Sequence, residues 1–105
     1  MTNKKLNLIT AVVQHKLGNA VIDAALKAGA TGATYFVAQG TGVRQGMGAQ
    51  GEDIEIVKRM ILIVTETNKT PAVMRAVVAA GGLDKAGQGV AYVQDVVDAV
   101  GFVAK

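Results

Sequence analysis

Two glycine-rich segments hold the residues best suited to bind a ligand. In one of them, Lys85 precedes Gly87-Gln88-Gly89. Closely spaced glycines let backbone N–H groups approach an anion without an intervening Cβ, and a lysine can neutralise a phosphate. No Lys-Ser/Thr pair follows Gly87, so the segment is not a Walker A loop. The alternative is a flexible connection with a solvated lysine.

The other segment, Ala38–Ile54, contains five glycines, more than a hairpin requires. Gly40-Thr41-Gly42 follows a predicted strand, and Arg44 and Gln45 add a fixed charge and an amide that can bind a carboxylate or phosphate. A glycine-rich hairpin is the alternative. Carboxylates at the far end could share a divalent cation but are more often solvated in a flexible loop, so we expect no metal: Glu52, Asp53 and Glu55.

The remaining polar residues form no catalytic set. The chain has one histidine, His15, and no cysteine or serine. Without a second histidine or a cysteine to share a metal, we expect His15 to be an exposed turn residue. Asp95 lies among apolar residues and is either buried and hydrogen-bonded or on an open sheet face. No nucleophile stands beside a base, so we expect a protein that is not an enzyme.

Composition indicates one small domain, residues 1–105. Half of the residues are hydrophobic, and the net charge of +3 is dispersed along the chain. No Lys/Arg run alternates with aromatics, so we expect no nucleic-acid partner. The longest apolar run, Met60–Val64, is too short to span a bilayer, and no signal-peptide core follows the first residues. We therefore expect a cytoplasmic protein.

Periodicity predicts four strands and two helices in the order β-α-β-β-α-β, the ferredoxin-like pattern of an α+β sandwich. Asn19 and Thr70 are the predicted N-caps, with Pro71 at the first helical position. Gly29 and Gly81 suit the helix ends. The expected strands are Leu6–Val13, Ala33–Gln39, Ile56–Thr65 and Val90–Val97, and the expected helices are Asn19–Ala28 and one from Thr70 to Gly81.

The two halves of the chain repeat each other. Ala25–Gly29 matches Val77–Gly81 at an offset of 52 residues, and Gly32–Tyr35 matches Gly89–Tyr92 at an offset of 57. The second half therefore has an insertion between its helix and its strand, around Leu83–Gly87. This repeat isolates the lysine–glycine segment as an added loop. Long irregular loops in compact domains are usually functional or disordered.

Four segments resemble the PII signalling family in order and spacing. Gly29–Thr34 resembles the family's turn into the second strand, and Gly40–Gly46 resembles the start of its long T-loop. Lys85–Val96 resembles its B-loop and last strand, and Leu17–Leu26 resembles its first helix. Together with the element order, the resemblance covers nearly the whole chain.

The resemblance implies a homotrimer with clefts between subunits that bind ATP or ADP, and a T-loop that docks onto transporters or metabolic enzymes. Gly40 and Gly42 would border the nucleotide, and main-chain groups near Thr31 and Val64 could contact its base. Gln45 would take the place of a glutamine that helps bind 2-oxoglutarate with Mg²⁺. The B-loop residues would wrap the phosphates: Lys85, Gly87, Gln88 and Gly89. With Thr41 and Arg44, these residues are the predicted ligand site.

Departures from the family pattern change the expected ligand. The family has cations at three positions that read Val90, Gly101 and Val103 here, and each lost charge-assisted contact costs about 1.5–3 kcal/mol. The T-loop, Ala38–Ile54, is shortened and lacks tyrosine and serine, so we expect no covalent modification there. The sequence resembles a divergent PII-like branch whose effector is ADP, AMP, ATP, a cyclic nucleotide, 2-oxoglutarate, bicarbonate or a metal.

Other classes of protein remain as alternatives. Microcompartment shell subunits also combine short α/β halves with a glycine-rich loop, and would assemble into flat sheets without sensing a nucleotide. A CutA-like trimer is a structural neighbour, although the Lys85–Gly89 loop fits PII better. A small ferredoxin-like enzyme is the third alternative, for which the sequence offers no catalytic set.

Overall fold

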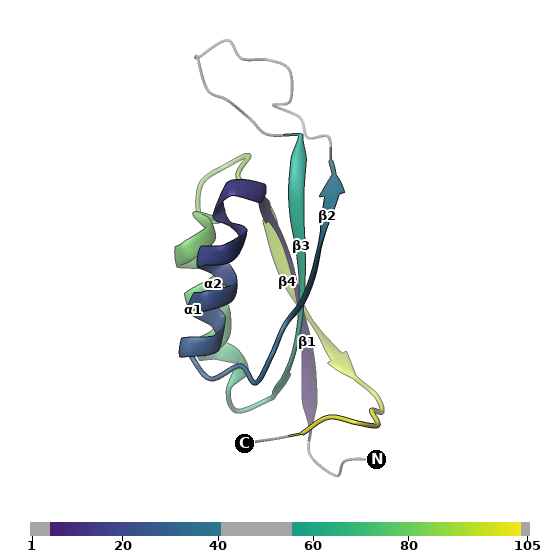
Figure 1. Ribbon diagram of the computed structural model, residues 1–105. Coiled ribbons are helices and arrows are strands. Elements are labelled where there is room, and N and C mark those ends of the chain that lie inside the picture. The colour runs from purple at the N-terminus through teal and green to yellow at the C-terminus, as the bar shows by residue number, and fades with distance from the viewer. Residues whose placement is uncertain (1–4, 41–55, 104–105) are drawn as a thin grey trace.

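The computed structural model describes residues 5–40 and 56–103. It has two layers, a four-stranded antiparallel sheet with two helices packed side by side on one face (Figure 1). The strand order is β2-β3-β1-β4, which confirms the predicted ferredoxin-like topology. The elements are β1 (Leu6–Gln14), η1 (His15–Leu17), α1 (Gly18–Lys27), β2 (Thr34–Gln39), β3 (Val57–Glu66), α2 (Thr70–Gly81) and β4 (Val90–Val96). Only the short η1 turn is absent from the predicted elements.

The core lies between the helices and the two central strands. Alternate residues of a strand point to one face, and here every second residue of β1 and β3 faces the helices. Small and β-branched side chains let the helices lie close to the sheet. The core residues are Ile9, Ala11, Val13, Val21, Ala25, Ile61, Ile63, Val73 and Val77, all fully buried.

Arg59 joins β3 to the start of α1. Its Nε donates to Nδ1 of His15 at 3.4 Å, and its Nη1 donates to Oδ1 of Asn19 at 3.1 Å. Its guanidinium lies 5.5 Å from the centre of the Tyr35 ring. The prediction that Asn19 caps α1 is wrong, because Leu17 occupies the N-cap position and Asn19 binds Arg59 instead. The prediction of an exposed His15 is also wrong, because the residue is half-buried.

Thr70 does not cap α2 as predicted, because Lys69 occupies that position and no side chain caps the helix. The buried Thr70 hydroxyl instead donates to Oδ1 of Asn7 at 2.8 Å and lies 2.7 Å from the Thr65 hydroxyl. Asn7 in turn donates to Asp95 at 3.0 Å, so the exposed Asp95 is also hydrogen-bonded. This network links α2 to strands β1, β3 and β4.

The other face of the sheet carries no helix (Figure 1). We call it the open face; it holds the even-numbered residues of β1 and β3 and their partners on β2 and β4. Sheets with one solvated face normally present polar residues there, but this face is largely apolar. Its apolar members are Leu6, Leu8, Val12, Phe36, Ala38, Met60, Leu62, Val64, Val90, Tyr92 and Val96.

Within the described ranges, neither helix has the length and apolar character that crossing a membrane would require.

Candidate functional site

Lys58 and Gly40 lie together at the ends of β3 and β2. The N–H of Gly40 donates to the carbonyl of Ile56 at 2.9 Å and extends the pairing of these strands. A Cβ on Gly40 would sit 3.4 Å from Cγ of Lys58, so the glycine leaves room for the lysine stem. Lys58 is only 9% exposed, and no ion pair joins it to another described residue. The ammonium group of Lys58 can therefore pair with a ligand anion.

Gln14 and Gln88 extend this site across the sheet. Gln14 pairs with Lys58 in the β1–β3 register, which places both side chains on the open face. Gln14 is 4% exposed, and its Nε2 donates to Oε1 of Gln88. Its own Oε1 is buried and accepts no hydrogen bond from a described residue. Gly40, Lys58, Gln14 and Gln88 therefore form one polar row, which we call the lysine row.

The loop between α2 and β4 is built from two successive turns. The N–H of Lys85 donates to Gly82 at 3.1 Å, and the N–H of Gln88 donates to Lys85 at 3.4 Å. Gly87 has a φ of 84°, a conformation that favours glycine. Gln88 therefore reaches the lysine row through its side chain, while the Lys85 side chain stays exposed.

Gly89 brings this loop against β1. A Cβ at this position would lie 2.1 Å from the carbonyl oxygen of Val12, and the φ of 150° is also unfavourable for other residues. Only glycine lets the chain pass close enough for Val90 to pair with Val12. Packing alone therefore requires this glycine, whether or not it also contacts a ligand.

Four predicted ligand residues lie outside the described residues, as do the acidic residues of the same loop. They are Thr41, Gly42, Arg44 and Gln45 in the ligand group, and Glu52, Asp53 and Glu55 in the acidic group. Across residues 5–40 and 56–103, no three His, Cys, Asp or Glu side chains are grouped to hold a metal. The structure thus places Gly40 and the Lys85–Gly89 loop at the same end of the sheet.

Sequence reasoning missed Lys58 and Gln14. Lys58 had a detectable signal, because it is a charged residue inside a strand of apolar residues, four positions before Leu62 on the same face. Gln14 had none, since it lies one residue past the predicted strand end. Its place in the row depends on its pairing with Lys58 across 44 residues of sequence.

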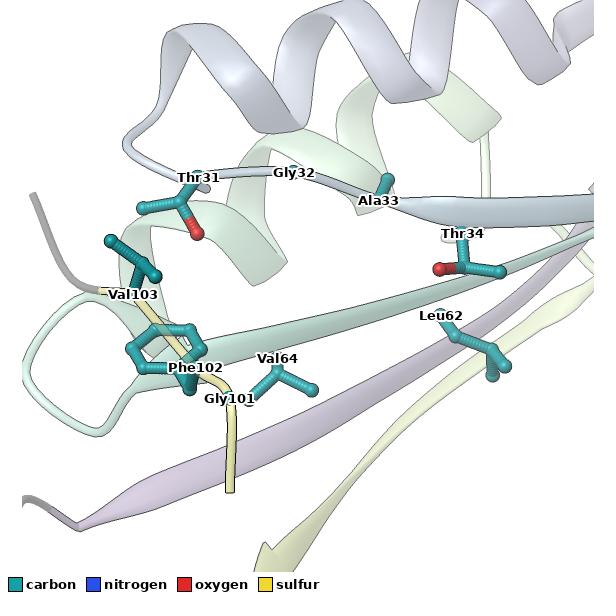
Figure 2. A pocket seen from close by; sticks show the side chains of 9 residues that line it. All are labelled: Thr31, Gly32, Ala33, Thr34, Leu62, Val64, Gly101, Phe102 and Val103. Atoms are coloured by element: carbon teal, nitrogen blue, oxygen red, sulfur yellow. The ribbon is translucent and has the colours of Figure 1, made fainter. Parts of the chain in front are cut away.

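A pocket of about 430 Å³ opens farther along β3, where the C-terminal segment crosses the sheet. Its lining combines the turn before β2, the open face of β3 and this segment (Figure 2). The lining residues are Thr31, Gly32, Ala33, Thr34, Leu62, Val64, Gly101, Phe102 and Val103. Among the described residues, none that lines it carries a charge.

Two of the lining residues are Thr31 and Val64. The PII resemblance implied that main-chain groups near these two residues contact the base of a nucleotide. Gly101 and Val103, where the family has cations, also line it. Phe102 between them was not anticipated, because nothing in the local sequence shows that the chain folds back across the sheet after β4.

The pocket and the lysine row share the open face. Leu62 and Lys58 lie four residues apart on β3, which corresponds to about 13 Å along a strand. The described part of the molecule thus combines an uncharged pocket and a lysine on an uncovered apolar sheet face. This arrangement defines a small ligand-binding α+β protein.

Comparison with known proteins identifies the family. The model for nitrogen regulatory protein P-II matches residues 6–102, so the chain belongs to the P-II family. This confirms the resemblance drawn from the sequence. Proteins of this family are generally signalling proteins that bind small ligands and are not enzymes.

Solved structures confirm the fold. A crystal structure of Arabidopsis thaliana PII bound to citrate superposes with a TM-score of 0.63 at 21% identity, covering 86% of this chain and 76% of that chain. A Bacillus cereus protein related to NIF3 gives a TM-score of 0.71 at 17% identity, covering 93% of this chain but only 27% of that longer chain. No curated protein matches the sequence significantly.

Proposed function

We propose that this protein is a cytoplasmic P-II-type sensor that assembles as a homotrimer. It binds an adenine nucleotide or a small anion in clefts between subunits. It presents the loop Ala38–Ile54 to a partner protein, a transporter or a metabolic enzyme, whose activity it regulates.

The observation that carries this proposal is the shared location of both candidate sites on the open face. A largely apolar sheet face of this kind favours burial against further copies of the chain. Phe36, Val90 and Tyr92 on this face are each about half exposed in the single chain. If copies cover the face, the pocket and the lysine row become clefts between subunits, and a ligand in them changes how the subunits meet.

The chemistry of the two places supports the ligand class. Lys58 has no carboxylate partner among the described residues. A phosphate or carboxylate would neutralise this lysine. The uncharged pocket suits the base of a nucleotide, and the citrate bound to the Arabidopsis thaliana relative is a carboxylate anion.

A thermal-shift panel tests the proposal, with ATP, ADP, AMP, cyclic AMP, 2-oxoglutarate, bicarbonate and citrate as ligands. A ligand at a hundred times its Kd stabilises by about 2.7 kcal/mol, which is a rise of roughly 10 °C for a domain of this size. We expect at least one adenine nucleotide to stabilise the protein. Lys58→Ala should remove most of the shift, and Lys85→Ala should weaken it.

Lys27→Ala is the matched control, because the Lys27 side chain is 79% exposed and its ion pair among the described residues is with Asp23 on the same helix. This variant should respond to ligands as the unaltered protein does. A confirmed trimer that responds to no ligand in the panel would refute the sensor proposal. Hexamers that form flat sheets would favour the shell alternative instead.

A further inference from the structure

Strand β2 forms one edge of the sheet, and its outer side is unpaired within the described part of the chain (Figure 1). The N–H of Gly40 donates to Ile56 in the β2–β3 register. Because bonded and unbonded positions alternate along an antiparallel pair, Tyr35, Val37 and Gln39 direct their N–H and C=O groups away from β3. A further strand can therefore form hydrogen bonds with these three residues.

This edge lacks the features that normally prevent a strand from adding to a sheet. Edge strands usually carry a charged residue, a proline or a bulge. β2 reads Thr-Tyr-Phe-Val-Ala-Gln, without a charge or a proline, and its pairing with β3 is continuous. Tyr35 and Val37 are 54% and 59% exposed. The opposite edge strand, β4, carries Asp95, so β2 is the less protected of the two edges.

A groove of about 380 Å³ lies beside this edge, on the helix side of the sheet. Its lining residues are Asn19, Ala20, Ile22 and Asp23 of α1 and Tyr35 of β2. The guanidinium of Arg59 lies 5.5 Å from the centre of the Tyr35 ring and supports this wall. Side chains alternate along a strand, so a strand added to β2 would direct every second side chain toward the groove.

The groove has a negative charge. Asp23 is the charged residue among those that line it. Its ion pair with Lys27 is exposed at both ends, and such pairs contribute little to stability, so an incoming cation can replace Lys27. Neither edge strand of this chain would supply that cation, because β2 is uncharged and β4 carries only Asp95. A basic segment of another protein therefore complements the groove better than a second copy does.

We propose that β2 binds an extended segment of a partner protein, which adds to the sheet as a further strand. Its apolar side chains contact Tyr35 and Ile22, and a basic side chain pairs with Asp23. Backbone hydrogen bonds give such a complex affinity, and alternate side chains give it specificity. The surface lies on the opposite side of the sheet from the open face, so this inference goes beyond the proposed function and does not depend on it.

Titration of the full chain with the peptide acetyl-Thr-Val-Thr-Arg-Thr-Val-Thr-amide, followed by amide NMR, tests the proposal. We expect the N–H signals of Tyr35, Val37 and Gln39 to shift, because these groups become hydrogen-bonded. A peptide with glutamate in place of the arginine should bind at least about fivefold more weakly. In Asp23→Lys this preference should reverse, and the glutamate peptide should bind more tightly.

Asp84→Lys is the matched control, because Asp84 is exposed in the loop between α2 and β4 and does not line the groove. It makes the same change in net charge and should keep the preference for the arginine peptide. Val37→Pro removes one outward N–H without removing a bond to β3, and an edge strand tolerates proline. It should weaken the arginine peptide about fivefold, with circular dichroism showing that the fold is retained.

Three results would overturn the proposal. They are failure of both peptides to bind, binding that leaves the three N–H signals unchanged, and a preference for arginine that persists in Asp23→Lys. Signals of β2 that shift with protein concentration alone would also overturn it, because a second copy would then occupy the edge. None of these results bears on the thermal-shift panel, so the proposed function would stand or fall separately.

Discussion

At the scale of single residues, Gly89 and Gly40 show how one position can serve both the fold and the site. Gly89 is required where the loop passes the backbone of β1, and the side chain beside it, Gln88, reaches the lysine row. Gly40 makes room for the stem of Lys58. Ligand-binding and structural explanations of these glycines are therefore compatible.

Replacing Gly89 by alanine should destabilise the fold strongly. The new Cβ would lie 2.1 Å from the carbonyl oxygen of Val12, and neither backbone can move without separating β4 from β1. We expect a loss of at least about 3 kcal/mol in the free energy of unfolding, measured by urea titration at fixed chain concentration.

Gly82→Ala is the comparison, because Gly82 also has a positive φ, of 63°, but a Cβ there meets nothing within 4 Å. Its cost should be about 1–2 kcal/mol, from backbone conformation alone. Equal losses in the two variants would show that the close approach to Val12 is not the cause.

At the scale of elements, side chains that usually cap helices are used here to connect layers. Asn19 receives Arg59 from β3, and Thr70 joins Asn7 and Thr65 beneath α2. Both residues have the chemistry of a cap, and both lie within the first two residues of their helices. Tertiary partners and the local backbone compete for hydrogen bonds with such side chains, and here the side chains of Asn19 and Thr70 bond to tertiary partners.

Gly18 and Arg59 should be energetically coupled. A Cβ on Gly18 would lie 2.8 Å from Cζ and 2.9 Å from Cγ of Arg59. Gly18→Ala should therefore cost about 1 kcal/mol in the full chain, although alanine is the better helix former by about 1 kcal/mol. With Arg59→Ala the atoms that oppose this Cβ are absent, and the same change should be neutral or stabilising.

A double-mutant cycle followed by urea unfolding measures this coupling, which we expect to be at least about 1 kcal/mol. Additive effects of the two substitutions would mean that Arg59 moves aside freely. The contact with Gly18 would then not fix the position of α1 against β3.

At the scale of the whole molecule, the open face is the main feature that a single chain leaves unexplained. The helices cover one face of the sheet (Figure 1). On the other face, the strand register places an apolar row along the centre. Both candidate sites open onto that face. Assembly and ligand binding are therefore expected to depend on each other.

Met60→Glu should prevent self-association. Met60 lies on central strand β3, opposite Val12 and Phe36 on the open face, and it does not line the pocket. A carboxylate buried there between copies would be unpaired and costly. We expect light scattering with size exclusion to show a trimer for the full chain and a monomer for this variant.

Arg75→Glu is the control. Arg75 is exposed on helix α2, so this substitution reverses a charge away from the open face. It should remain trimeric. A Met60→Glu protein that stays trimeric would place the contacts between copies somewhere other than the open face.

Local pattern alone determined the elements, their order and the repeat, and through them the two glycine-rich loops. It did so because apolar spacing, prolines and glycines act within a few residues of each other. The resemblance to the PII family followed from the same segments, and the family match over residues 6–102 confirms it.

Tertiary structure decided which side chains meet. Lys58 and Gln14 are paired by strand register, Gln88 reaches Gln14 from the loop before β4, and Phe102 returns across the sheet to the turn at Thr31. Such contacts join residues that are far apart in the chain, so no local pattern encodes them. The lysine–glycine loop is thus only part of the site, and the uncharged pocket walled by Phe102 lies farther along the same open face.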